Sequence, residues 1–449
     1  MTTPATSEPA QEAALAQDVD TSPAPSNLAP DTGHPLQRST ALRFGAGFLA
    51  ISVLWALGLS SVATVLLPQR LKDLGVADPS ALLASISAVT AIVSLLSNLV
   101  FGNLSDRTRS RLGRRTPWVA AGGILGGVTL LGVGVIDNTL LLTIDYCLCM
   151  VGLNMMLAPA VAVLSDRVPA SIRGTMSTFW GVGAAIGYPL GAIIGARFIT
   201  TGEAQLSGFL LGGVLMAASG LVTVIIWPRE RSAQDLPSTG QSVGEVLRSF
   251  VPPTRNAGDF YKAFVGRFTM LLSYQMINAY QLYIIQDHLK DSGQSLSVGQ
   301  VAATVTLTNT IIMVAGLVGG FISGPISDLL RRRKVPVVFA SLCFAVGVAM
   351  PWMMPTTTGM YLFALIAGFG YAVYGAVDQA LNVDVLPDPE KAGKDLGILN
   401  MSTTLGQMCG PLITASIVSS TSGYGLVFPI SITFAVLGCF SILSIRRVR

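Results

Sequence analysis

Long stretches without a charged residue constrain this chain more than any other feature of its sequence. In the first half there are six of them, and each is about 20 or more residues long and mostly apolar. They are 44–69, 79–105, 116–136, 146–165, 174–196 and 204–228. A helix rises about 1.5 Å per residue, so about 20 residues cross the roughly 30 Å of hydrocarbon in a bilayer. Each stretch therefore predicts one membrane-spanning helix.

The second half repeats this pattern, although two of its stretches are long enough for two spans each. The stretches are 268–286, 292–327, 335–377 and 396–445. Turn-forming residues at 354–359 and 419–423 divide the last two. The total is twelve spans, six on each side of a polar loop. A β-barrel would show alternating ten-residue segments instead. We expect an all-α membrane protein with twelve transmembrane helices.

The composition agrees with a chain that is embedded in lipid. Charged residues make up 12% of the 449 residues, whereas about 25% is usual in soluble domains. Two histidines and five cysteines offer little material for a metal centre or a cofactor site, so we expect neither. A nucleic-acid partner is not expected either, because the basic residues follow the loops between the spans. We expect a monomer in the bilayer.

The basic residues also predict how the chain is oriented. With a cytoplasmic N-terminus, 23 of the 28 Lys and Arg lie inside and four lie outside. Cytoplasmic loops are enriched in Lys and Arg, so we expect both termini in the cytoplasm and a multi-pass protein of the cytoplasmic (plasma) membrane. Residues 1–42 predict a disordered tail, and 229–260 predict a polar cytoplasmic linker between helical bundles at 43–228 and 261–449.

Landmarks in the two halves recur at a nearly constant offset, which indicates an internal duplication. Gly102 to Asp106 closes span two and Gly324 to Asp328 closes span eight, 222 residues later. Gly183 and Gly187 in span five match Gly406 and Gly410 in span eleven. Two pseudo-symmetric six-helix bundles joined by a linker are typical of alternating-access transporters, whose site lies near the midplane between the repeats.

The loop after span two carries a motif, DRTRSRLGRRTPW, over residues 106–118. Together with the twelve-span layout it resembles the major facilitator superfamily, and this long form is similar to that of the glycoside–cation symporters and sucrose transporters. The resemblance implies a cytoplasmic latch that joins the two halves and favours the outward-open state. The residues it assigns to this latch are Gly102, Asp106, Arg107, Gly113, Arg114 and Arg115, with Asp328 and Arg332 in the second repeat.

Span five has glycines every four residues, from Gly183 to Gly195, which would let another helix approach closely. Gly183 and Gly187 also resemble the superfamily's antiporter motif. In that motif proline directly follows the last glycine, but here Tyr188 stands between Gly187 and Pro189. We therefore prefer helix packing as the interpretation, and an exporter stays the second alternative.

Three ionisable residues border the charge-free stretches and fall inside the helices expected there, where such a group is costly and suggests a functional role. They are Asp145 in span four, Arg267 in span seven and Asp378 in span ten. Arg267 could snorkel to the interface. A carboxylate whose surroundings alternate between wet and dry can gain and lose a proton, so we expect these residues to couple transport to protons, with Asp145 facing a cavity.

Polar and aromatic side chains recur at helical spacing in the spans that the resemblance places around a central cavity. The predicted substrate-binding residues are Trp55, Asn154, Tyr274, Asn278, Gln281 and Tyr374. Amides, hydroxyls and aromatic faces suit an uncharged polyhydroxylated ligand.

The predicted function is transport of a small organic solute, with a sugar or glycoside favoured, by alternating access in symport with protons. The alternative is proton-driven efflux of a drug or metabolite. A membrane-embedded enzyme is not expected, because the spans lack clusters of histidine, cysteine and acidic residues.

Overall fold

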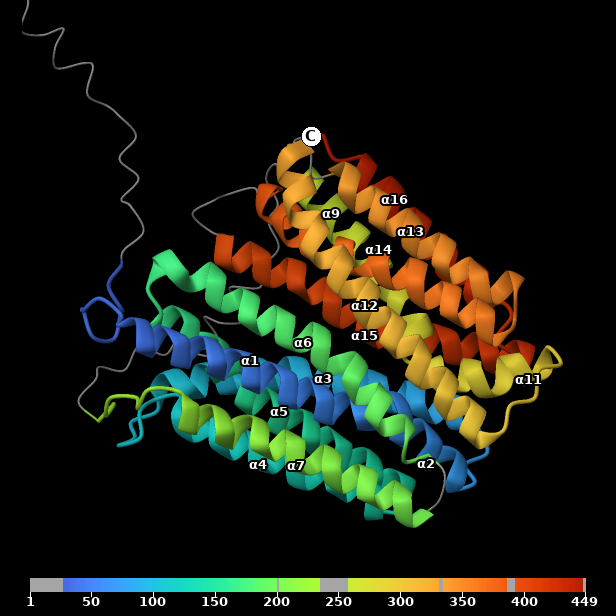
Figure 1. The fold of residues 1–449 in the computed structure, drawn as a ribbon, viewed down its shortest axis with the longest axis horizontal. Helices are drawn as coiled ribbons and strands as arrows, with labels where there is room; N and C mark the ends of the chain where they lie inside the picture. Colours follow the sequence, from blue (N-terminus) through green and yellow to red (C-terminus); the bar gives the residue numbers. More distant parts are fainter. Residues whose placement is uncertain (1–26, 200–201, 235–256, 331–333, 386–391, 447–449) are drawn as a thin grey trace, which may run out of the picture.

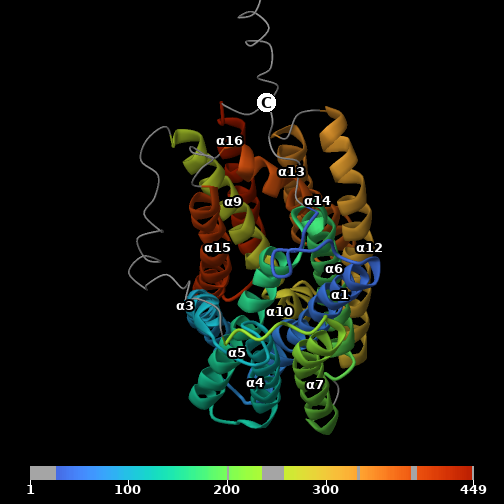
Figure 2. The same ribbon diagram turned by 90° about the vertical axis from the view of Figure 1, so that its left-hand side faces the viewer.

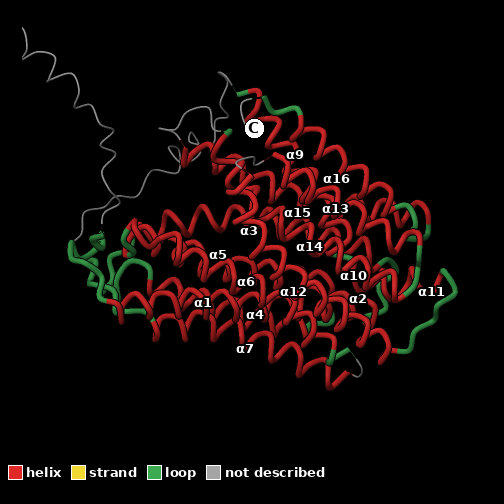
Figure 3. The backbone as a smooth tube through the Cα atoms, turned by 45° about the horizontal axis from the view of Figure 1, so that its top comes forward, coloured by secondary structure: helices red, strands yellow, loops and turns green. Residues whose placement is uncertain are grey.

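The chain is described by a computed structural model over residues 27–199, 202–234, 257–330, 334–385 and 392–446. Within these ranges the side chains of 202–204, 323–330, 379–380, 383–384 and 392–397 are not described. The described residues form helices and connecting loops, with one isolated β-bridge between Leu28 and Pro35 (Figure 3). The predicted all-α fold is confirmed.

The first half contains six long helical segments. They are α1 (Arg38–Ser61), which continues through a π-helical turn (Val62–Leu66) into α2 (Leu67–Asp73), then α3 (Pro79–Arg107), α4 (Thr116–Val135), α5 (Thr139–Arg167), α6 (Arg173–Ala196) and α7 (Gly202–Ile226). Helix α1 begins before residue 43, the expected start of the first bundle. Residues 1–26 and 235–256, which include most of the expected tail and linker, lie outside the described residues.

The second half repeats this arrangement. Its elements are α9 (Gly258–Asn278), α10 (Gln281–Tyr283), a π-helical turn (Ile284–His288), α11 (Leu289–Asp291), α12 (Val298–Leu330), α13 (Lys334–Met353), α14 (Thr357–Asp384), α15 (Ala392–Thr421) and α16 (Val427–Leu443). The segment α9 to α11 corresponds to the broken first helix, α1 to α2. Both are interrupted by a π-helical turn, the kind of irregularity that often marks a functional position.

Among the described residues, nine helical segments are long and apolar enough to cross a membrane, and α16 is a shorter apolar helix. The two long segments outside this set, α9 and α15, carry more polar residues. Large apolar side chains lie on the outer surface of the spans, including Val128 at 64%, Phe321 at 69% and Phe440 at 64% exposed. An apolar surface of this kind matches a surrounding of lipid.

The helix ends follow local sequence signals. Asp78 caps α3 by accepting a hydrogen bond from the backbone N–H of Ala81, and the Asn138 side chain accepts those of Leu140 and Leu141 at the start of α5. Proline occupies the first turn of α3 and of α4, where no backbone N–H is needed.

The packing of helices is the same in both halves, which confirms the duplication. In the first half α1 packs on α6 and α7, α4 packs on α5 and α7, and α3 packs on α5. In the second half α9 packs on α15 and α16, α13 packs on α14 and α16, and α12 packs on α14. The halves meet through two further pairs, α3 with α15 and α6 with α12, which the same symmetry exchanges.

The glycines of α6 let α1 lie directly against it. A Cβ added at Gly187 would come within 2.7 Å of the Val53 carbonyl oxygen, and one at Gly191 within 2.4 Å of that of Leu57. Gly410 in α15 is similarly close to Leu272 in α9. The packing interpretation of this glycine series is therefore confirmed.

Both described ends of the chain lie at one end of the molecule, called here the termini face, where α1 begins and α16 ends (Figures 1 and 2). The other end, called the opposite face, carries α2 and α11. The two halves approach one another at the opposite face, and their helices diverge towards the termini face (Figure 1).

Candidate functional site: an aromatic centre between two halves

Aromatic side chains from both halves come together near the middle of their helices. In the first half, the Trp55 ring meets Tyr188 edge to face, with centroids 5.3 Å apart. In the second half, Tyr274 and Tyr371 stack face to face, with centroids 3.7 Å apart and planes 8° from parallel. Tyr188 is close enough to interact electrostatically with Tyr274 and Tyr371 across the boundary. We call these four residues the aromatic centre.

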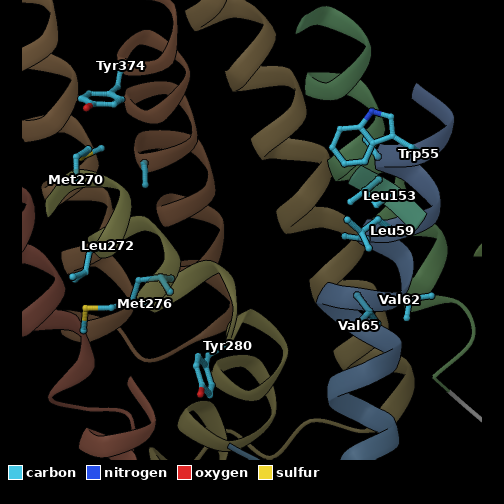
Figure 4. Packing of buried hydrophobic residues seen from close by; sticks show 14 of the residues in the cluster. Trp55, Leu59, Val62, Val65, Leu153, Met270, Leu272, Met276, Tyr280 and Tyr374 are labelled. Carbon is cyan, nitrogen blue, oxygen red and sulfur yellow. The ribbon is translucent and has the colours of Figure 1, made fainter. Parts of the chain in front are cut away.

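Tyr188 is the most exposed side chain of the aromatic centre. Tyr188 lies in the middle of α6, yet 42% of it is exposed. Trp55 is 8% exposed, and its indole Nε1 is buried without a hydrogen-bond partner. Trp55 projects from the first half and Tyr374 from the second, on opposite sides of the view (Figure 4).

The three side-chain amides predicted to bind substrate are each held by a hydrogen bond. Asn154 on α5 accepts a hydrogen bond from Asn98 on α3 at 3.3 Å, and Gln281 accepts one from Asn309 on α12 at 3.3 Å. Asn278 accepts a hydrogen bond from the Tyr274 hydroxyl at 3.3 Å. Amides held in place by a partner keep their remaining donors and acceptors in fixed directions, as a specific polar site requires.

Two of the three ionisable residues predicted inside the spans form a buried ion pair. Arg267 Nη1 lies 3.0 Å from Asp378 Oδ2, and their side chains are 9% and 5% exposed. Asn382 donates a hydrogen bond to the same carboxylate at 2.9 Å, and Arg267 Nε donates one to Thr403 at 3.2 Å. The Tyr374 hydroxyl neighbours Asp378. Arg267 therefore does not snorkel; it is neutralised inside the second half.

Asp145 is placed differently from the prediction. Its carboxylate lies against α4, where a Cβ added at Gly132 would be 2.5 Å from Asp145 Oδ2. Helix α4 packs against α5 and α7, on the flank of the first half. The expectation that Asp145 faces a central cavity was wrong, because the spacing along α5 fixes the depth of the side chain but not which neighbour it faces.

The predicted latch residues of the first repeat form a charge network at the termini face. Arg115, 4% exposed, donates to Asp106 and, through Nε at 2.9 Å, to Asp166 at the end of α5. Arg114 Nη2 lies 3.6 Å from Asp166. Arg107 is the last residue of α3, and an added Cβ at Gly102 would meet no atom within 4 Å. The Asp328 side chain and Arg332 lie outside the described residues.

Glu230 completes this network, and the sequence analysis did not identify it. Its carboxylate accepts the backbone N–H groups of Arg114, Arg115 and Thr116 at 2.9–3.2 Å, and so caps the N-terminus of α4. Gly113 has φ +96°, and a Cβ there would lie 2.2 Å from Glu230 Cδ, so only glycine fits. A negative charge at a helix N-terminus is stabilising, which explains this position.

At the opposite face, polar contacts join the two halves. Lys72 Nζ lies 2.7 Å from Asp287 Oδ2, and Gln286 donates a hydrogen bond to Gln69 at 2.8 Å. Three hydroxyls take part as well. Tyr283 donates to the Pro68 carbonyl, Tyr280 to that of Ser80, and Ser419 to the Asp78 carboxylate. We call these contacts the opposite-face seal.

The site residues that sequence reasoning missed had weak signals. Tyr188 stands out in the sequence only because it interrupts a glycine–proline pattern, and Tyr371 has no motif that distinguishes it from other tyrosines of the spans. The residues of the opposite-face seal lie in short segments of mixed polarity, where no motif marks a contact between distant parts of the chain.

A family model described as Major Facilitator Superfamily matches residues 44–303 and 263–448. The chain belongs to this superfamily. It is therefore a multi-pass membrane protein of a family of transporters of small solutes, as the sequence resemblance implied.

Curated superfamily relatives carry several different names. A protein of Haemophilus influenzae named as a metabolite transport protein is 22% identical over 384 residues, 76% of this chain and 82% of the relative. A protein of Arabidopsis thaliana named as glycerol-3-phosphate transporter 1 is 23% identical over 394 residues, 78% of this chain and 72% of the relative. Multidrug resistance protein 3 of Bacillus subtilis is 30% identical over 131 residues, 29% of this chain and a quarter (25%) of the relative.

Solved structures share the fold at low identity. The nucleoside transporter NupG superposes with a TM-score of 0.67 at 15% identity, covering 90% of this chain and 100% of that one. A bacterial homologue of the human lysosomal transporter Spinster, inward-facing and unoccupied, superposes with a TM-score of 0.65 at 13% identity, covering 91% and 94%.

Proposed function

We propose that this superfamily member is a secondary active transporter of the cytoplasmic membrane. It takes up a small, uncharged organic solute, with a sugar or glycoside favoured, by alternating access in symport with protons. The observation that carries the proposal is the aromatic centre, to which both halves contribute side chains near mid-depth. Solute held there is exposed to one side or the other as the halves rock about it.

In this proposal the structure is the inward-facing state, with the termini face in the cytoplasm. The bias of Lys and Arg towards the loops of that face supports the orientation. The opposite-face seal, with the Lys72–Asp287 ion pair, closes the outer side. The protein works as a monomer, because one chain supplies both halves of the site.

Arg267 and Asp378 are the proposed coupling pair. A proton added to Asp378 would remove the negative charge that holds Arg267, and the pair lies about two helical turns from Tyr371 and Tyr274 along α14 and α9. Solute and proton could thus affect each other's binding through neighbouring groups. Asp145 is not retained in this role, since it faces α4.

The network around Arg115 is the proposed cytoplasmic latch. In the inward-facing state its acidic partners Asp106 and Asp166 both belong to the first half. In the outward-open state the second half would close onto this face, and the open space beside Gly102 gives an approaching helix room.

Proton-driven efflux of a drug or metabolite is the second candidate, favoured by the 30% identity to a multidrug resistance protein over part of the chain. Uptake into proteoliposomes separates the two. Symport predicts that an inward proton gradient drives solute accumulation and that a protonophore abolishes it. Export of preloaded solute driven by the same gradient would contradict symport.

A further inference from the structure

We propose that the aromatic centre selects an uncharged solute that carries a planar ring, and that Tyr188 is the residue that holds this ring from the first half. The inference rests on the proposed function and adds the class of substrate. It follows from three observations: the orientation of the rings, the neutralised arginine and the unpaired indole nitrogen.

The ring geometry favours a flat ligand. Tyr274 and Tyr371 are already parallel, so they present a rigid aromatic wall from the second half. Tyr188 of the first half interacts electrostatically with both tyrosines, is 42% exposed and packs edge to face with Trp55. A planar ring between Tyr188 and Tyr371 would contact an aromatic surface on both faces, and offset stacking adds to the energy of simple burial. A saturated ring would meet the same walls with less contact.

The charges disfavour an anion. Arg267 is the buried cation nearest the aromatic centre among the described residues, and Asp378 already occupies it at 3.0 Å. The Arg267 Nε donor is used by Thr403. A phosphate group would have to compete with a buried carboxylate for this arginine, and it would place another negative charge beside Asp378. The site therefore differs from what a sugar phosphate or glycerol phosphate requires.

The polar groups indicate what the ring must carry. The Trp55 indole N–H is a donor, it is more than nine-tenths buried and it has no partner. A buried donor left unpaired costs about 1–3 kcal/mol, so a ligand acceptor that pairs with it when the indole turns towards the ligand would be favoured. Uncharged compounds with a planar ring and acceptor oxygens fit this description. Nucleosides and aryl glycosides both have these two features.

The test uses the purified full-length protein in two assays, thermal unfolding and counterflow in proteoliposomes. Four probes are compared at equal concentration: uridine, 4-nitrophenyl β-glucoside, glucose and glycerol 3-phosphate. We expect uridine, the aryl glucoside or both to raise the unfolding temperature and to sustain counterflow. The probe that does so shows whether the planar ring is that of a nucleoside or of an aryl glycoside. Glycerol 3-phosphate should do neither, and glucose should be weaker than the aryl glucoside.

Two variants and a control assign the effect to Tyr188. Tyr188→Leu should weaken binding of the active planar probe about tenfold, since a lost aromatic contact is worth up to about that factor. Tyr188→Phe keeps the ring and should bind as the wild type does. Tyr361→Leu, a tyrosine near the start of α14, controls for the general loss of an aromatic side chain and should also leave binding unchanged.

Three results would overturn the inference. They are a response to glucose or glycerol 3-phosphate without a response to the planar probes, silence towards both planar probes, and unchanged probe affinity in Tyr188→Leu. A response to glucose, silence towards both planar probes or unchanged affinity in Tyr188→Leu leaves the proposed function standing, because a transporter of another uncharged solute would still accumulate it with a proton gradient. A response to glycerol 3-phosphate would also contradict the uncharged solute of that proposal. If Tyr188→Leu unfolds, Tyr371→Leu tests the opposite wall in the same way.

Discussion

Individual side chains near mid-depth divide into two sets with different tasks. In the proposed function the aromatic centre presents surface to a ligand, whereas Arg267 and Asp378 satisfy one another within the second half. Placing an ion pair beside an uncharged site keeps the cost of buried charge low and leaves one carboxylate that can exchange a proton.

Variants of the coupling pair, Arg267 and Asp378, should change the stability of the protein and its proton-coupled transport separately. Asp378→Asn leaves Arg267 buried and unpaired, which should lower the free energy of unfolding by about 3–5 kcal/mol. Adding Arg267→Gln removes the unpaired charge and should restore most of the stability, but neither variant should accumulate solute with a proton gradient. Thermal unfolding and gradient-driven uptake measure the two effects.

Asp145→Asn is the matched control, because Asp145 is also an aspartate within a span but faces α4. We expect it to accumulate solute as the wild type does. Wild-type accumulation by Asp378→Asn, or loss of accumulation by Asp145→Asn, would contradict the assignment of the coupling pair.

Sequence reasoning found the depth of most site residues but not their partners. Arg267 and Asp378 lie 111 residues apart, and no spacing rule reveals that they meet. In the sequence Asp145 and Asp378 look alike, because each is a carboxylate inside a span. Only the structure distinguishes their surroundings, since it places Asp145 against α4. Hydropathy reports how deep a residue lies, whereas its partner depends on the rotation of each helix.

At the scale of elements, the sequence predicts nearly the whole architecture. The spans, the internal repeat and the close packing at the glycines of α6 all follow from regular patterns, although the patterns do not name α1 as the partner. The broken helices α1–α2 and α9–α11 do not, since a π-helical turn depends on tertiary contacts more than on the residues within it.

The α1–α6 contact predicts different effects for two glycines of one helix. Gly187→Ala would place a Cβ within 2.7 Å of the Val53 carbonyl oxygen and should cost about 1–3 kcal/mol in the free energy of unfolding. Gly181→Ala meets no atom within 4 Å and should be neutral or stabilising. Unfolding temperatures measured in one detergent compare them, and equal values would argue against close packing here.

The cap of α4 makes a further prediction. Glu230→Ala leaves three backbone N–H groups without their acceptor and should lower the free energy of unfolding by about 0.5–2 kcal/mol. Chemical or thermal unfolding measures the loss. Glu230→Asp, which keeps the charge on a shorter side chain, should recover part of it; a fully stable Glu230→Ala would show that the cap is dispensable.

At the scale of the whole molecule, the proposed mechanism uses the duplication to present one site to two sides. The same helix pairs pack within each half, and the main helix contacts between the halves are α3 with α15 and α6 with α12. Each half can therefore move as a unit when the contacts of one face break. Lys72 and Asp287, with side chains 26% and 39% exposed, form the ion pair of the opposite-face seal.

Distances between spin labels on the two halves test this account most directly. One label pair, at Ser85 and Ser420, spans the opposite face, and a second pair, at Arg111 and Ser444, spans the termini face. Lys72→Gln removes an ion pair between the halves, while the control Arg70→Gln removes one within the first half, to Asp137. Losing about 1 kcal/mol from the seal should shift the ratio of the two states roughly fivefold.

In Lys72→Gln we expect double electron–electron resonance to show a larger population of long distances at the opposite face. A larger population of short distances should appear at the termini face in the same sample, while Arg70→Gln resembles the wild type. Distances that stay unchanged at both faces, or that lengthen at both together, would contradict two halves rocking about a central site.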